Sequence, residues 1–455
     1  MKEFVLIGLD AVTMNNDREI IIDAAIAVSG SKIKAIGKRE TVVENFHYPK
    51  IDRTGSGKRM IALPGFTQTH VHTSQSLGRG LADDCDLITW TRKRIWPYEA
   101  ALSEEDVYVS ALLSMAELIK SGTTTFAEAA GEHPSAIGRA IIDSGIKGII
   151  TLSTMDLPGE IPEALRMTTE EAIERNLALV ESWEDRHPRV RAGCNILNNF
   201  LCSEKLWIEL SDLALSHHTI LECHLAESPS EVEFVLEKTG KRPIEYLYDL
   251  GVLGPHIIGA HVVYPTEKEL DMLQECDLKV AHCPSAGLRL CGIAPIPQML
   301  ERNINVSLGT NSPPCSNRNS LFDEMWLAAM MHKGVEQNPE IVPGYQVLEM
   351  ATINGAAALG RSEQTGSLEA DKTADIVLLN LNQLPTTPTN ELISTLIYQA
   401  TAACVDTVYV NGEAVLEEGA LKTIDEEWLI GEAERRARDI VRRADIRVPS
   451  PWPVV

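Results

Sequence analysis

No stretch of the sequence resembles a membrane span, a secretion signal or a disulfide framework. Charged residues interrupt the apolar runs before any of them reaches the ~18 residues of a transmembrane helix, and the amino-terminal segment lacks a basic-then-apolar signal pattern. The nine cysteines are odd in number, scattered and without a CxxC pair, as in proteins whose thiols stay reduced. We therefore expect a cytoplasmic protein that does not bind membranes.

Basic clusters are also lacking. The 455 residues include 65 Asp and Glu against 41 Lys and Arg, which gives a formal net charge of -24. The run RKR at 92–94 is too short to form a basic patch. Because an acidic surface repels nucleic acid and anionic membranes, we expect a small molecule as the binding partner.

Short β-strand patterns fill the two ends of the chain. Residues 1–60 contain two apolar runs joined by SGSK at 29–32, which is a hairpin signal. Residues 374–422 have a similar pattern, in which Asn-Gly at 411–412 marks another turn. We predict that the two segments build one small β domain around a central insertion.

Continuous apolar runs alternate with helical patterns in the central segment, 61–373. Two of the helical stretches, 103–122 and 228–240, begin at serine N-cap signals. The apolar runs lie at 60–70, 123–128, 147–154, 189–196, 219–227, 256–264, 278–285 and 304–311. Such strands, separated by helices, are typical of a parallel sheet buried on both faces. Eight repeats predict an α/β fold of the (β/α)8 TIM-barrel type, followed at 423–455 by an amphipathic helix on the barrel's outside and a tail.

Titratable side chains gather at the carboxyl ends of these runs, which meet at one mouth in a barrel. His70 and His72 alternate along the first strand and can therefore face one ion. The fifth to eighth runs add His224, Glu227, His261, His282 and Asn311. One histidine at a strand end is more often a hydrogen-bonded structural residue. Five of the twelve histidines in this arrangement predict a mononuclear metal site.

This set of side chains favours a hydrolase. Imidazole nitrogens suit zinc, iron or cobalt, and three histidines leave a position open for water, as in catalytic sites. A divalent metal lowers the pKa of that water towards ~7. Glu227 lies close in sequence to His224 and can supply the proton that a leaving group needs.

Several stretches together resemble the amidohydrolase superfamily, in particular the branch of the chlorotriazine hydrolases and the methylthioadenosine/S-adenosylhomocysteine deaminases. The likeness extends over nearly the whole chain and depends on LPGFTQTHVHTSQSLGRG, SGTTTFAE, HLAES, GAHVVY, AHCPSAGLRLCGIAPIPQML, LEMATINGAAALG and GSLEADKTADIVLLNL. It implies a (β/α)8 barrel with a composite β-sandwich formed by both termini, and a homo-oligomer.

The resemblance implies that one divalent metal, zinc before iron or cobalt, is held by His70, His72 and His224. The eighth strand would supply a further ligand, and here the chain departs from the family pattern. Most of the branch has GTD, whereas this chain has GTN with Asn311. The amide oxygen can still approach the metal, but it accepts no proton at neutral pH. A neutral ligand also leaves more positive charge at the metal, which lowers the pKa of bound water.

The resemblance also implies roles for the surrounding residues. Glu227 would carry protons to the substrate, and His261 would contact the water or the substrate and, in some members, the metal. Asn311 cannot accept the proton that an aspartate would take at this position, so Glu227 or His261 would accept it instead. His282 would contact the substrate. Trp90 and Trp96 would help to close the pocket, although packing within their own loop is an equal alternative.

The residues leave three functions open. Asn at this strand-8 position is shared with the phenylurea hydrolases and molinate hydrolase, so we first expect hydrolysis of a C–N or C–S bond in a small neutral urea, carbamate or thiocarbamate, such as a herbicide. The alternative is an aminohydrolase of an aminopurine nucleoside or an s-triazine, which the HLAE and HCP motifs fit and Asn311 opposes. The third is a non-catalytic metal-binding scaffold, which the intact histidines and Glu227 disfavour.

Overall fold

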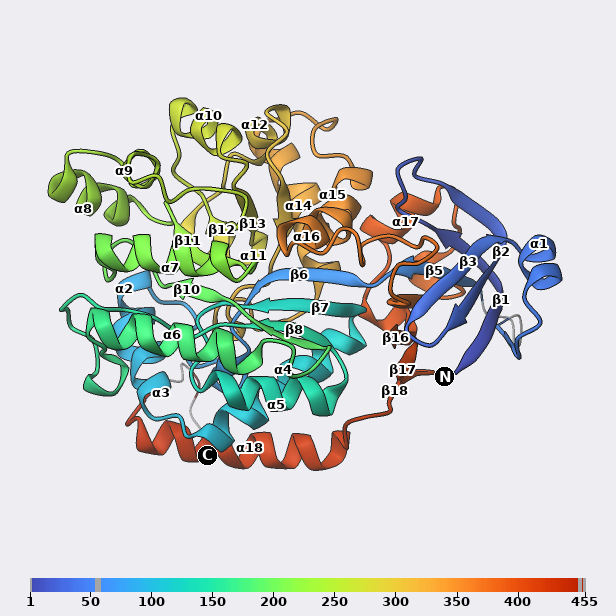
Figure 1. Cartoon of the computed structure of the whole chain (residues 1–455), viewed down its shortest axis with the longest axis horizontal. Coiled ribbons are helices and arrows are strands. Elements are labelled where there is room, and N and C mark those ends of the chain that lie inside the picture. Colours follow the sequence, from blue (N-terminus) through green and yellow to red (C-terminus); the bar gives the residue numbers. More distant parts are fainter. Residues whose placement is uncertain (1, 54–58, 449–451, 453–455) are drawn as a thin grey trace.

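The computed structural model describes residues 2–53, 59–448 and 452, whose strands form three sheets. A four-stranded and a five-stranded sheet, both parallel, together make a barrel, and a nine-stranded sheet lies at one end of it (Figure 1). The predicted α/β fold, a barrel with an additional β domain, is confirmed.

The barrel strands follow one another in chain order. Their bounds are β6 (Phe66–Val71), β7 (Thr123–Glu128), β8 (Lys147–Ile150), β9 (Val190–Ala192), β10 (Cys194–Ile196), β11 (Leu221–Leu225), β12 (Ile257–His261), β13 (Lys279–His282) and β14 (Val306–Leu308). β9 and β10 continue one another across Gly193, whose N–H donates to the carbonyl of Ile150 at 2.9 Å. A parallel bridge between Val71 and Asn311 joins the two ends of the barrel.

Helices cover the outside of the barrel (Figure 1). The longer ones are α4 (Glu104–Lys120), α5 (Pro134–Ser144), α6 (Thr169–Trp183), α7 (Glu204–Ser216), α8 (Pro229–Thr239), α9 (Pro243–Asp249), α10 (Glu267–Glu275), α12 (Ile296–Glu301), α14 (Leu321–Val335), α15 (Gly344–Ala351) and α16 (Ile353–Ala358). Short helices in the loops are α2 (Leu87–Trp90), α3 (Trp96–Ala100), α11 (Pro284–Ala286) and α13 (Pro313–Ser316). The predicted caps are confirmed, since the hydroxyls of Ser103 and Ser228 accept backbone hydrogen bonds at the starts of α4 and α8.

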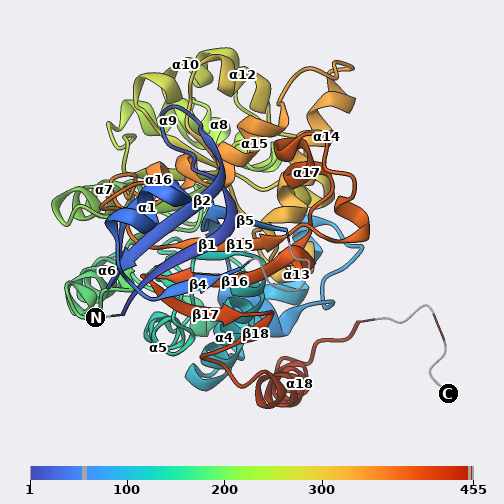
Figure 2. The ribbon, with the colours of Figure 1, turned by 90° about the vertical axis from the view of Figure 1, so that its right-hand side faces the viewer.

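The nine-stranded sheet combines strands from both ends of the chain. Its members are β1 (Glu3–Val12), β2 (Ile20–Ser29), β3 (Lys32–Lys38), β4 (Lys50–Asp52), β5 (Met60–Pro64), β15 (Ile376–Asn380), β16 (Val405–Val410), β17 (Glu413–Glu417) and β18 (Ala420–Leu421). β5 lies between β1 and β15 and pairs parallel with the first and antiparallel with the second. Figure 2 looks onto this sheet from the side opposite the barrel, with α1 (Arg39–Asn45) and α17 (Leu392–Tyr398) beside it.

The apolar run expected as one strand at 60–70 is two strands in the structure. Gly65 separates β5 of the β domain from β6 of the barrel, and a Cβ at this position would collide with the side chain of Thr124. The polypeptide therefore passes from one unit to the other within a few residues. The domain limits of 1–60 plus 374–422, 61–373 and 423–455 stay a prediction, and residues 1, 54–58, 449–451 and 453–455 within them lie outside the described residues.

The carboxyl-terminal helix α18 (Glu426–Arg443) packs along α4 on the outside of the barrel. Its Arg436 and Arg443 both pair with Asp106, a carboxylate of α4 that is only 1% exposed. In the part of the chain that the structure describes, no helix has the length and apolar character needed to cross a membrane.

Candidate metal centre

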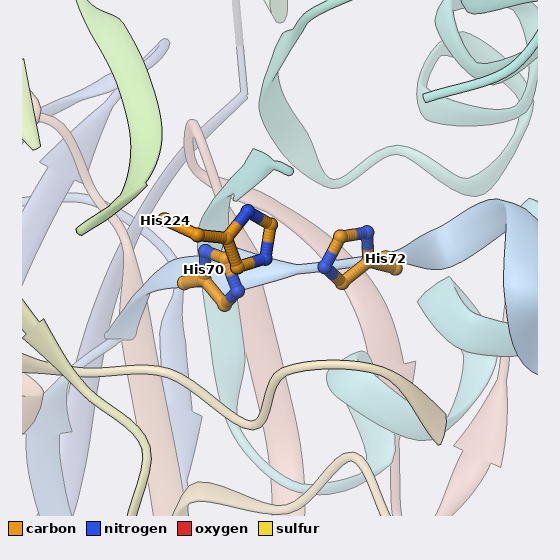
Figure 3. A group of neighbouring side chains, drawn as sticks. All are labelled: His70, His72 and His224. Carbon is orange, nitrogen blue, oxygen red and sulfur yellow. The ribbon is translucent and has the colours of Figure 1, made fainter. Parts of the chain in front are cut away.

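Three histidines meet at the carboxyl end of the barrel (Figure 3). His70 lies in β6, His72 directly follows that strand, and His224 lies in β11. Each offers one ring nitrogen, and the three nitrogens lie within 4.8 Å of one another. The Nε2 of His70 and the Nδ1 of His72 are buried without a hydrogen-bond partner among the described residues. Converging, unpartnered imidazole nitrogens fit a metal ion.

Burial keeps the imidazoles of His70 and His72 neutral. Desolvation lowers the pKa of His70 well below its ordinary value, and repulsion from His224 lowers it further. Desolvation has the same effect on the pKa of His72, to which the neighbouring histidines add. Because a neutral imidazole keeps a lone pair for coordination, both side chains are in the form that a cation requires.

Glu222, a residue that the sequence reasoning missed, orients His70. One oxygen of its fully buried carboxylate accepts a hydrogen bond from Nδ1 of His70. The other accepts from Nδ2 of Asn195 at 2.6 Å. A hydrogen bond at Nδ1 leaves Nε2 as the coordinating nitrogen. Glu222 precedes His224 by two residues in β11, so strand alternation, which already paired His70 with His72, could have identified it.

Asn311 lies against the same histidines. Its backbone is left-handed, with φ of 58°, a conformation that asparagine adopts more readily than most residues. Its N–H donates to the carbonyl of His70 at 3.1 Å, and the residue lines a cavity together with His72 and His224. The structure thus brings the amide to the histidine cluster, and its role as a metal ligand stays a prediction.

Glu227, His261 and Cys291 form a second group beside the three histidines. Nε2 of His261 lies 3.6 Å from Oε1 of Glu227, and the Cys291 thiol donates to the same oxygen at 3.2 Å. Burial raises the pKa of Cys291 well above its ordinary value, so the thiol stays protonated and remains a donor. Burial also lowers the pKa of His261 to about 3, which leaves this imidazole neutral. The Glu227 carboxylate is thus held between an imidazole and a thiol.

A cavity extends from this centre to the mouth of the barrel. Its lining includes His72, Gln75, Glu99, Ala130, Leu197, Asn198, His224, Glu227 and Asn311, together with Leu87, Trp90, Thr91, Ile95, Trp96 and Leu290. Both predicted tryptophans border it, and the indole Nε1 of Trp90 is buried without a partner among the described residues. His282 is not in this lining; its Nε2 lies 3.3 Å from Nε2 of His332. The catalytic and substrate-binding roles of Glu227, His261, Trp90 and His282 stay predictions.

Comparisons with known proteins agree with this geometry. The amidohydrolase family matches residues 61–415. A 5-methylthioadenosine/S-adenosylhomocysteine deaminase of Caldanaerobacter subterraneus subsp. tengcongensis is 34% identical over 437 residues, which cover 96% of this chain and 98% of the relative.

Two solved structures are also similar. An adenosine deaminase from Xanthomonas campestris with bound zinc has a TM-score of 0.91 and 27% identity, with 97% of this chain and 99% of that chain covered. An atrazine chlorohydrolase from Arthrobacter aurescens TC1, complexed with zinc, has a TM-score of 0.88 and 23% identity over 95% and 100% of the two chains, a likeness that concerns the fold alone. Most of this chain, including every residue of the centre, lies within the family match, and the chain is an enzyme that belongs to the amidohydrolase family.

Proposed function

We propose that the protein is a zinc-dependent aminohydrolase that removes an amino group from the ring of an aminopurine nucleoside or a related heterocycle. The observation that carries this proposal is the similarity to a deaminase along almost the whole chain, with Glu227, His72 and His224 lining the cavity and His70 beside those two histidines. This reverses the order expected from the sequence, which placed ureas and thiocarbamates first.

His70, His72 and His224 would hold the metal, with Asn311 beside them. When bound, a divalent metal makes water a nucleophile near neutral pH and polarises the bond under attack. Glu227 is positioned to protonate the ring nitrogen and then the departing amine. Asn311 cannot accept the proton released by water, so this proton passes to Glu227, or to the neutral His261 3.6 Å away from it.

A second carboxyl group in the cavity supports a hydroxylated substrate. Glu99 is 9% exposed, lines the cavity together with Glu227, and accepts a hydrogen bond from Nε2 of Gln75 at 2.7 Å. Burial raises its pKa to about 8, so near neutral pH it both donates and accepts hydrogen bonds. A sugar diol offers two hydroxyls that each donate and accept, whereas a phenylurea offers only its N–H and carbonyl oxygen, and an N,N-dialkyl thiocarbamate only its carbonyl oxygen.

The second candidate is hydrolysis of a neutral urea, carbamate or thiocarbamate, and Asn311 is the observation that favours it. Attack on an aromatic ring carbon costs the ring its aromaticity, whereas attack on a carbonyl carbon does not. A site that has lost one proton acceptor therefore suits the carbonyl reaction better. The apolar residues of the lining, such as Trp90 and Leu290, also fit a substrate without charge. Membership of the phenylurea and molinate hydrolase group stays part of this proposal.

The two candidates are separated by their products. The zinc-loaded protein is incubated with methylthioadenosine, S-adenosylhomocysteine, a chlorotriazine, a phenylurea and a thiocarbamate, and ammonia, chloride, aniline and thiol are measured. Ammonia from the nucleosides supports the first candidate. Cleavage of the urea or thiocarbamate without nucleoside turnover refutes it and establishes the second. Absence of turnover with every compound would contradict both candidates.

Asn311→Asp provides an independent test. We expect the variant to keep its metal, because aspartate offers an oxygen in the same place. If deamination is the native reaction, the regained proton acceptor should raise turnover several-fold; if carbonyl hydrolysis is native, turnover should fall.

A homo-oligomer and a cytoplasmic location remain expectations, and light scattering of the purified protein tests the first of these.

A further inference from the structure

A hollow of about 510 Å³ lies at the opposite end of the barrel from the metal centre. Its walls are the carboxyl ends of α6 and α7, the start of β9, and the segment that follows α16. Arg361 and Gln364 of that segment also line a neighbouring hollow against the β domain, which includes Lys147 and Glu413. Arg361 and Gln364 are common to both hollows, and the second also includes Gly412 and Glu413 of the β domain.

Two arginines in this hollow lack an acidic partner. Arg361 is only 8% exposed, and its Nε is buried without a hydrogen bond. Among the residues that the structure describes, its guanidinium donates only to the Gln364 side chain, at 3.2 Å. Arg191 donates to the backbone carbonyl of His218 at 2.8 Å. Within the described residues, no carboxylate oxygen lies within 4.0 Å of either guanidinium. A buried cation without an anion is strongly unfavourable.

The nearby carboxylates are engaged elsewhere. Asp375 pairs with Lys147, and Glu413 pairs with Arg189. Burial, and then repulsion from Arg191, lower the pKa of Arg361 to about 10, and the weaker opposing attraction of Asp375, which already pairs with Lys147, does not offset them. In a chain with a formal charge of -24, acidic partners are abundant, which makes two unpaired guanidinium groups in one hollow unusual.

Other groups at the hollow do not neutralise Arg361. The carboxyl end of α7 carries a partial negative charge, but the carbonyl contact there goes to Arg191. Glu184 at the end of α6 is exposed and lies 3.7 Å from Nδ1 of His217. Asp185 is exposed on the rim and forms no ion pair within 4.0 Å in the described part of the chain.

We propose that this hollow binds a phosphate group, held by Arg361 and Arg191. Guanidinium groups pair with tetrahedral oxyanions through two parallel hydrogen bonds, and the hollow is large enough for the anion and its water. A bound phosphate would connect β9 of the barrel with the segment leading to β15 of the β domain. The site is independent of the metal centre and therefore of the proposed function.

The test is thermal unfolding of the full-length protein in orthophosphate, compared with sodium chloride at equal ionic strength. We expect phosphate to raise the Tm by a few degrees and to saturate in the millimolar range, whereas the general effect of salt does not saturate. Arg361→Met should unfold at the same or a higher temperature than the wild type without phosphate, because it removes an unpaired buried charge. The same variant should lose the phosphate response, so the order of stability reverses when phosphate is present.

Arg302→Gln is the control, since Arg302 pairs with Glu267 and Asp271 far from the hollow; it should keep the full phosphate response. Arg191→Gln should reduce the rise in Tm caused by phosphate, and this variant provides the test if Arg361→Met does not fold. Glycerol 3-phosphate identifies the source of the anion: a response at least as strong as with orthophosphate indicates a phosphate ester, and a response to orthophosphate alone indicates the free ion. No saturable shift in the wild type, or a shift that survives both arginine substitutions, overturns the proposal.

Discussion

Replacing Glu222 by glutamine should weaken metal binding while the barrel stays folded. Glutamine has nearly the same shape, but its amide lacks the negative charge that the imidazole of His70 contacts. It also turns an NH2 group towards Nδ2 of Asn195, where the carboxylate now accepts a hydrogen bond at 2.6 Å. Both changes loosen the orientation of one metal-binding ring.

The size of the effect follows from the burial of this contact. Glu222 and His70 are both 0% exposed, and a hydrogen bond to a charged group of this kind contributes about 1.5–3 kcal/mol. Loss of an orienting partner of a histidine ligand typically costs about 10–100-fold in metal affinity, which matches that range. We therefore expect the zinc dissociation constant to rise about 10–100-fold.

The assay is competition for zinc with a chromophoric chelator, with circular dichroism to confirm folding. Glu231→Gln is the matched control, because Glu231 is a glutamate only 1% exposed that contacts Asn199 and the backbone of Glu227, and it hydrogen-bonds to no histidine among the described residues. It should bind zinc like the wild type. If Glu222→Gln binds zinc within twofold of the wild type, the carboxylate does not orient His70 and the reasoning is wrong.

Three further outcomes can be checked. Glu227→Gln should lower kcat by at least about a hundredfold with zinc content unchanged; near-normal turnover would remove Glu227 from proton transfer. Cys291→Ala should lower kcat about tenfold, because the hydrogen bond to Glu227 is lost, and Cys291→Ser should retain most of the wild-type kcat. Cys315 is a neighbouring buried thiol, and Cys315→Ala should have little effect on kcat. Burial raises the pKa of Glu324 to about 7, so the folded protein binds the carboxyl proton of Glu324 more tightly than the unfolded chain does. As the pH rises from 4.5 to 7, the folded state therefore loses up to about 3 kcal/mol of stability. Urea unfolding at several pH values should show a flatter dependence for Glu324→Gln, and equal slopes would contradict the assignment.

The barrel and the histidine cluster were predictable because they depend on local periodicity. Continuous apolar runs are typical of parallel strands, and the carboxyl ends of such strands meet, so His70, His72 and His224 had to lie near one another. Asn311 was placed with them for the same reason. The strand limits were less accurate at Gly65, because one apolar run can belong to two sheets and periodicity does not mark the change.

Contacts between distant loops were not predictable. Cys291 approaches Glu227 only because the loop after β13 turns back over the centre, where the hydroxyl of Tyr264 donates to the Cys291 carbonyl at 2.8 Å. The contact between His282 and His332 likewise joins a strand to a helix 50 residues away. Neither pairing leaves a signal in residue type or spacing.

The position of β5 in the middle of the nine-stranded sheet has a consequence for biosynthesis. Its partners are β1, which is made earlier, and β15, which is made more than 300 residues later. While the ribosome extends the chain, the barrel strands can pair in order, whereas one edge of β5 stays open until residues 376–380 emerge. An open edge can pair with other chains. We therefore expect nascent or carboxyl-truncated forms to aggregate through β5, although their metal-binding histidines are already complete.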